Sequence, residues 1–91
     1  MSPAFKRDVF KVDPFWFGRN AGDPVKTYFP QFWGLLHDLD YRLHWGKYLP
    51  DNTSSFLPDR YPHWKDFLKV RREMDPYGIF LTDYWRKHLG I

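Results

Sequence analysis

The aromatic side chains of this sequence outnumber those that a chain of its length can bury. Of its 91 residues 22% are aromatic, with five Trp, six Tyr and nine Phe, while aliphatic residues are scarce. A chain this short forms at most one small domain, which buries only a modest fraction of its surface and is marginally stable alone. Because aromatic residues are enriched where proteins meet partners or ligands, we expect much of this apolar surface to lie against a larger body.

Charge and the absent residue types exclude several classes of function. The net charge is +3, from 14 basic and 11 acidic residues that are interspersed, so there is no dedicated nucleic-acid footprint. The chain has no cysteine, which excludes disulfides, thiolate metal sites and cysteine nucleophiles. His37, His63 and His88 lack the paired spacing of metal ligands, so no metal is expected. The sequence also has no phosphate-binding glycine loop and no hydrolase nucleophile motif, so no independent enzymatic activity is expected.

No apolar run in the sequence is long enough to cross a bilayer. Residues 1–8 lack the hydrophobic stretch of a secretory signal and are interpreted as an N-terminal tail. We therefore expect a soluble, cytoplasmic protein.

The first half of the chain predicts one strand and one helix. Residues 9–17 (VFKVDPFWF) are rich in β-branched and aromatic residues, which favours a strand, with Pro14 confining it to a sheet edge or ending it. Asp23 followed by Pro24 is typical of a helix start, and an apolar stripe follows at spacings of three and four. Pro30 places the start of the helix, or a kink, at that residue.

The second half predicts a second strand at residues 41–48 (YRLHWGKY) and a loop at residues 50–59. A helix follows from Pro62, with Trp64, Phe67, Leu68 and Met74 inward and Lys65, Lys69, Arg71 and Arg72 outward. Residues 75–78 (DPYG) predict a structural turn, and Thr82 can cap a last short helix. The expected fold class is therefore α+β, with two or three strands and two to three helices.

Two segments resemble a known family. His44, Trp45, Gly46 and Lys47 form an HWGK sequence, and residues 74–80 (MDPYGIF) follow near the end of the chain. Both are similar to the C-terminal region of FAD-linked oxidases with the vanillyl-alcohol-oxidase fold, in the group of D-arabinono-1,4-lactone, L-gulonolactone and alditol oxidases. The likeness covers residues 9–91, and the order and spacing of the two segments strengthen it.

The resemblance implies a C-terminal part of a substrate domain at residues 9–91, without the FAD-binding domain. By this likeness Lys47 lies near the flavin and the substrate hydroxyl as the catalytic group, while His44, Trp45 and Gly46 contact the cofactor. Lysine suits such a role because it can stabilise charge that develops near the substrate oxygen or the reduced flavin. The family's usual histidine soon after the lysine is absent here, where Tyr48 follows, so the substrate can be a lactone, an alditol or another alcohol.

Each of these residues also has a plain structural interpretation. Lys47 can be a surface lysine at a strand end, His44 a hydrogen-bonded structural group, and Gly46 a strand-ending bulge. On a regular strand Trp45 and Lys47 would share one face and His44 would lie on the other.

Two further hypotheses concern the whole chain. One is a small basic and aromatic module that stacks single-stranded nucleic acid or carbohydrate on its tryptophans, which are Trp16, Trp33, Trp45, Trp64 and Trp85. The other is a remnant that keeps the fold without activity. The oxidase interpretation differs from both in requiring a flavin-binding domain or subunit as the partner and a small alcohol or lactone as the substrate.

Overall fold

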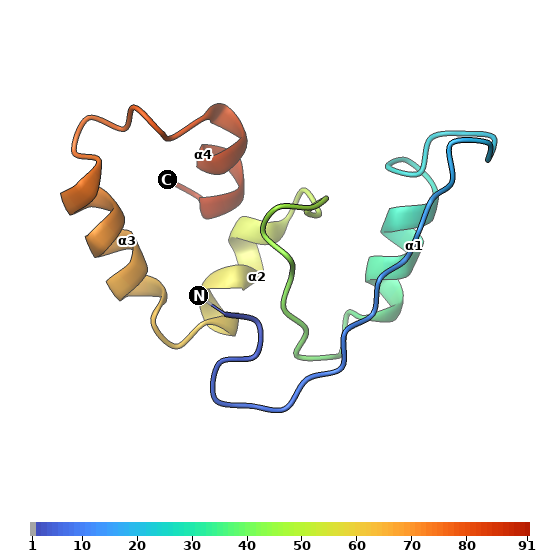
Figure 1. Ribbon diagram of the computed structural model, residues 1–91, viewed down its shortest axis with the longest axis horizontal. Coiled ribbons are helices and arrows are strands. Elements are labelled where there is room, and N and C mark those ends of the chain that lie inside the picture. The colour runs from blue at the N-terminus through green and yellow to red at the C-terminus, as the bar shows by residue number, and fades with distance from the viewer. Residues whose placement is uncertain (1) are drawn as a thin grey trace.

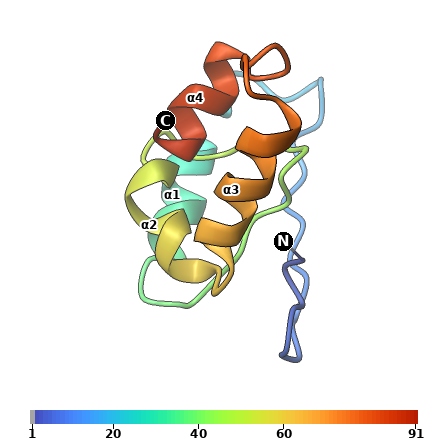
Figure 2. The same cartoon turned by 90° about the vertical axis from the view of Figure 1, so that its left-hand side faces the viewer.

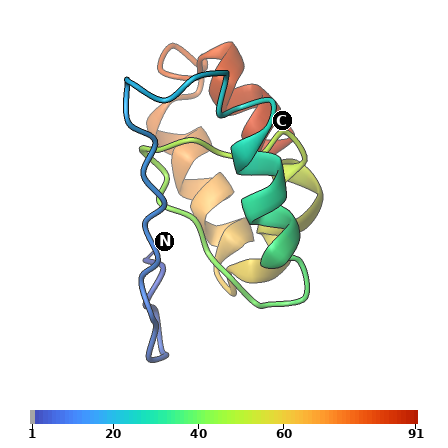
Figure 3. The ribbon, with the colours of Figure 1, turned by 90° about the vertical axis from the view of Figure 1, so that its right-hand side faces the viewer.

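The computed structural model describes residues 2–91 and is built from helices joined by irregular segments of very different length (Figure 1). In order these are α1 (Tyr28–Leu35), α2 (Thr53–Arg60), α3 (Trp64–Met74) and α4 (Asp83–Leu89). Helices α3 and α4 both pack against α2, and these three face the viewer in Figure 2. Helix α1 stands apart from them and lies in front in Figure 3.

The expected α+β class is wrong, because no strand forms anywhere in residues 2–91. Residues 9–17 run as an irregular, largely exposed segment, and residues 41–48 contain a turn. Aromatic and β-branched residues favour a strand because their side chains fit a pleated, half-buried surface. A strand also needs a neighbouring strand to complete its backbone hydrogen bonds. Among the described residues neither segment has such a neighbour.

The loop expected at residues 50–59 is also wrong, since most of it belongs to α2. Its serine, threonine and aspartate residues suggested a loop because these side chains compete for backbone hydrogen bonds. The deciding feature is Leu57, which is fully buried at 0% exposure and gives the helix an inward face. Pro58 lies within the helix, so tertiary packing outweighs local propensity here.

The other helices follow the sequence signals more closely. Asp23 accepts from the Val25 backbone N–H at 3.0 Å and so stabilises the turn that precedes α1, although the helix itself begins only at Tyr28. Pro30 lies in the first turn of α1, where no intrahelical donor is needed. Thr82 caps α4 as predicted, accepting from the Trp85 N–H at 3.4 Å. Gly90 ends α4 in the left-handed conformation.

The core is an aromatic cluster under α2, α3 and α4. Leu57, Tyr61, Trp64 and Leu89 are buried, and Trp45 inserts among them from the segment before α2. The Trp45 ring centroid lies 6.0 Å from that of Trp64 and 5.9 Å from that of Trp85. The inward stripe of α3 is confirmed at Trp64, Phe67 and Leu68.

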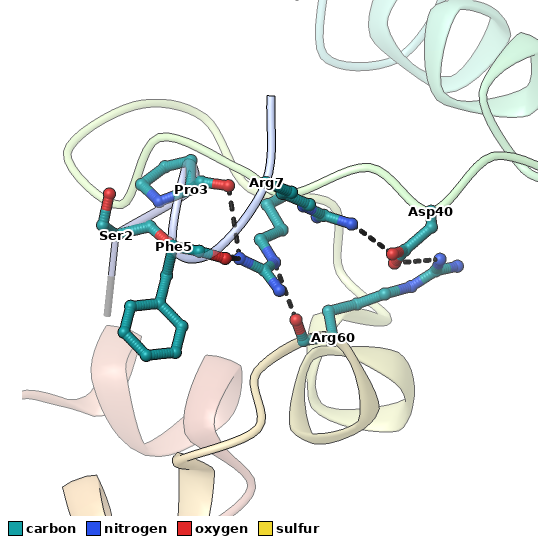
Figure 4. A network of polar contacts seen from close by, with 7 residues as sticks. Ser2, Pro3, Phe5, Arg7, Asp40 and Arg60 are labelled. Carbon is teal, nitrogen blue, oxygen red and sulfur yellow. Dashed lines mark hydrogen bonds and ion pairs between the residues drawn. The ribbon is translucent and has the colours of Figure 1, made fainter. Parts of the chain in front are cut away.

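A polar network ties the N-terminal segment to the end of α2 (Figure 4). Asp40 accepts from Arg60 at 2.8 Å and also pairs with Arg7, and the hydrogen bond from Arg60 holds the pKa of this carboxyl below its usual range. The Arg42 Nε donates to the Arg60 carbonyl at 2.7 Å, and its Nη1 reaches three N-terminal carbonyls, those of Ser2, Pro3 and Phe5. The N-terminal segment is thus held through arginines and through the edge-on packing of Phe5 against the His63 ring, with 5.4 Å between the ring centroids.

A buried polar pair fastens α4 to α2. The Thr53 hydroxyl lies 2.5 Å from the His88 Nδ1, and the two residues are only 0% and 3% exposed. Burial lowers the pKa of His88 from its ordinary value of 6.5, the Lys87 charge lowers it further, and Asp51 opposes the shift. His88 is therefore a neutral core residue at pH 7.

Replacing Leu57 by alanine is expected to destabilise the chain by about 2 to 5 kcal/mol, because a fully buried side chain leaves a cavity. The measurement is urea unfolding followed by tryptophan fluorescence. The matched control is Leu35→Ala on α1, where the side chain is 82% exposed and the loss should stay within about 0.5 kcal/mol. Equal losses at the two positions would contradict a core centred on α2.

The buried His88 predicts a stability that falls with acidity. Because its pKa is lowered in the folded state, the unfolded chain takes up a proton that the folded chain refuses, so stability decreases as the pH falls through 6.5. The urea midpoint should therefore drop between about pH 7.5 and 5.5. His88→Asn keeps a polar atom near Thr53 and should remove most of this slope, whereas His37→Asn, at an exposed position, should leave it unchanged.

Candidate functional site

The HWGK segment, residues 44–47, is a tight turn. The Lys47 backbone N–H donates to the His44 carbonyl at 3.1 Å, and the Gly46 N–H donates to the His44 Nδ1 at 3.0 Å. A Cβ atom added at Gly46 would lie 3.3 Å from the His44 ring, closer than nine in ten real contacts of this kind. Glycine therefore leaves room for the imidazole to fold back over the turn.

This turn separates the residues that a strand would have placed together. Trp45 points into the core, where its Nε1 donates to the Tyr61 hydroxyl at 3.2 Å, while His44 and Lys47 are exposed. The prediction that Trp45 and Lys47 lie on one face of a strand is wrong, because the chain turns here and its side chains do not alternate as they would along a strand. Burial raises the pKa of the Tyr61 hydroxyl, which stays a neutral hydrogen-bond partner.

Lys47 is held by its backbone and not by its side chain. Its carbonyl accepts from the Tyr84 hydroxyl at 3.2 Å, and the Tyr84 ring packs 4.3 Å, between centroids, from the ring of His88. The Lys47 ammonium forms no ion pair within residues 2–91. The Lys47 backbone is thus held by a hydrogen bond, while its side chain is exposed and carries an unpaired positive charge among the described residues.

A second feature, which sequence reasoning missed, is an open apolar cavity of about 620 Å³ between α3, the loop that follows it and α4. Its wall includes Trp45, Phe67, Phe80 and Trp85, so the core tryptophan of the HWGK turn also reaches this cavity. The cavity is lined by Arg71 as well, although an outward position was expected for this residue. The missed signal is its spacing of seven residues from Trp64, which returns Arg71 to the inward face of the helix.

The DPYG segment, residues 75–78, is the structural turn that the sequence predicts. The Gly78 N–H donates to the Asp75 carbonyl at 3.1 Å, and Gly78 adopts a positive φ of 67°. The Asp75 carboxylate accepts from the Ile79 and Phe80 backbone N–H groups at 2.8 and 3.1 Å. Met74, expected on the inward face, is instead 80% exposed at the edge of this turn, because α3 ends there.

Two absences concern the described part of the chain. Residues 2–91 contain no group of three histidine, aspartate or glutamate side chains placed to hold a metal ion. None of the helices formed by these residues is long and apolar enough to cross a membrane.

The structure therefore defines a small helical unit with an outward lysine on one turn and an apolar cavity beside it. Its sequence matches the model of the D-arabinono-1,4-lactone oxidase family over residues 2–88, and the chain belongs to that family. This confirms the resemblance seen in the HWGK and DPYG segments.

Curated relatives agree with this assignment. The chain is 36% identical over 90 residues to an L-gulono-1,4-lactone dehydrogenase of Mycobacterium tuberculosis, covering 99% of this chain and 20% of that protein. It is 27% identical over 88 residues to the L-gulonolactone oxidases of Mus musculus and Bos taurus, covering 96% of this chain and 20% of theirs. The chain thus spans about a fifth of the length of the relatives that it matches. No solved structure matches it significantly.

Proposed function

We propose that this chain is the C-terminal part, over residues 9–91, of an FAD-dependent oxidoreductase that oxidises a CH–OH group of a sugar lactone or a related alcohol. In this proposal the HWGK turn forms one wall of the active site, and the chain works only together with a flavin-binding portion. The observation that carries the proposal is the family match over residues 2–88, combined with a span of 20% of the relatives.

The exposed apolar surface supports the need for a covering body. Phe10 is fully exposed, and the same extended segment displays further large apolar side chains, those of Val9, Val12, Phe15 and Phe17. A protein that works alone rarely leaves so many large apolar groups in water, since covering them with a partner lowers the free energy. This segment is suited to pack against the flavin-binding portion.

The chain's own residues fit one edge of a flavin but not its phosphates. Among the described residues other than Trp45 and Lys47, only the His44 ring lies within 4 Å of a Cβ added at Gly46, so a planar group can approach the turn from the open side. The sequence has no glycine-rich loop that could hold a pyrophosphate, so the cofactor's main anchorage must come from another part of the protein. Bound there, the flavin would accept the hydride that leaves the substrate carbon.

Lys47 is proposed as the catalytic group. Its ammonium can donate a hydrogen bond to the substrate oxygen or to the cofactor edge and so stabilise negative charge that develops there. His44, folded over Gly46, would orient one rim of the cofactor, and Trp45 would hold the turn in place from beneath. The exposure of Lys47 suits this role, because a partner can then cover and partly desolvate it.

The stacking module is less well supported. Three of its five proposed platforms, Trp45, Trp64 and Trp85, pack together around the core, so neighbouring side chains cover part of each ring. A stacking surface needs open ring faces along one groove.

A chimera tests the catalytic proposal. This chain replaces the matching stretch of the M. tuberculosis L-gulono-1,4-lactone dehydrogenase, and turnover of L-gulono-1,4-lactone is measured with an artificial electron acceptor. In the chimera, Lys47→Met is expected to lower kcat by about 10²-fold, because a positioned donor at the reacting oxygen is lost. The isolated chain should show no turnover.

Lys69→Met serves as the matched control, since Lys69 is an exposed lysine of α3 that contacts Glu73 only at the limit of 4.0 Å. It should leave kcat unchanged. Lys47→Met with full activity would defeat the catalytic role of Lys47, and a folded chimera that binds flavin but is inactive would favour the remnant.

A further inference from the structure

Arg71 introduces an unbalanced charge into the apolar cavity. Arg71 is one of the residues that line the cavity, and its Nε and Nη1 atoms are covered by protein without any hydrogen-bond partner among the described residues. A guanidinium that has lost hydration without gaining acceptors costs free energy, so proteins normally pair it with a carboxylate or phosphate. The described residues therefore provide no hydrogen-bond acceptor for these two nitrogen atoms of Arg71.

The nearest acidic residue of the cavity does not supply that group. Asp75 also lines the cavity, four residues after Arg71, yet the two form no ion pair. The Asp75 carboxylate is committed to the Ile79 and Phe80 backbone N–H groups of the turn, at 2.8 and 3.1 Å. Turning it toward Arg71 would open the loop that shapes the cavity.

The apolar surface continues beyond the cavity. Met74 and Phe80 of the cavity wall are 80% and 82% exposed, and Tyr77 and Ile79, which form a rim in the same loop outside the wall, are 87% and 76% exposed. A small ligand would fill the cavity and leave this rim in water, whereas an apolar stretch of polypeptide would cover both. The extent of the surface therefore favours a polypeptide over a free small molecule.

We propose that the cavity between α3, the 75–82 loop and α4 docks a polypeptide segment that places one carboxylate side chain, flanked by apolar side chains, against Arg71. The Nε and Nη1 atoms are covered by protein, so the incoming carboxylate would pair with the guanidinium through its remaining nitrogen, Nη2. The source of this segment is inferred from the proposed function. The segment belongs to the portion of the enzyme that this chain, which covers 20% of its relative, does not contain.

Two short peptides test the chemistry directly on the chain as it stands. The probes are acetyl-Leu-Glu-Phe-amide and its neutral counterpart acetyl-Leu-Gln-Phe-amide, and binding is followed through the fluorescence of the cavity tryptophans. The glutamate peptide should bind about tenfold more tightly, because a charge-assisted hydrogen bond replaces a neutral one. Arg71→Met should abolish this preference, and Arg72→Met, on the exposed side of α3, should keep it.

Stability provides the second readout. Since Arg71 is uncompensated, Arg71→Met should raise the melting temperature of the isolated chain, by about 4 °C, while it removes peptide discrimination. A fall in melting temperature, or a glutamate preference that survives Arg71→Met, would overturn the proposal. So would binding of 3-phenylpropionate as tight as that of the glutamate peptide, because it would identify a small carboxylate as the occupant.

The chimera tests whether the carboxylate comes from the rest of the enzyme. There Arg71→Met should lower the melting temperature, opposite to its effect in the isolated chain, and Arg72→Met should be neutral in both. Stabilisation of the chimera by Arg71→Met would exclude the rest of the enzyme as the source of the carboxylate. Lactone turnover by the unsubstituted chimera is a separate readout, so the docking proposal and the oxidase proposal can fail independently.

Discussion

The packing of Trp45 between Trp64 and Trp85 is the contact on which the rest of this structure depends. It anchors an irregular segment to α3 and α4, and it fixes the position of the turn that begins at His44. A two-ring contact of this kind combines a large buried area with a preferred geometry, so it can position a loop that has no regular hydrogen bonding. The packing of Trp45 therefore also determines where the backbone of the exposed Lys47 lies.

The sequence predicted those elements whose signals are local. The stripe of Trp64, Phe67 and Leu68, the cap at Thr82 and the DPYG turn each depend on neighbours a few residues away, and all three are present. The two strands were wrong because strand formation depends on a partner that no local pattern specifies. Residues 9–17 have a strand-like composition, yet the described chain offers them no sheet edge.

The candidate site was only partly predictable for the same reason. The HWGK residues were found from their resemblance to a family, but their arrangement depends on the reversal of the chain at Gly46, which alternation along a strand does not describe. Arg71 was placed outward on the basis of its charge, although its helical spacing from Trp64 places it inward. Where charge and periodicity disagree, a partly buried cation without a partner is informative, because covering its polar atoms costs free energy.

Lys47 and Arg71 are each linked to Trp45, because Lys47 belongs to the same turn and Arg71 lines the same cavity. Lys47 is exposed and needs a covering body before its charge can act strongly, since water screens an exposed ammonium. Arg71 is partly buried, with two guanidinium nitrogens that have no partner, and needs a counter-charge that the described chain does not provide. One neighbouring body that brings a carboxylate to the cavity and closes over the turn would satisfy both requirements at once. Trp45 lines the cavity and also anchors the HWGK turn. A segment bound in the cavity would therefore also restrict the motion of this turn.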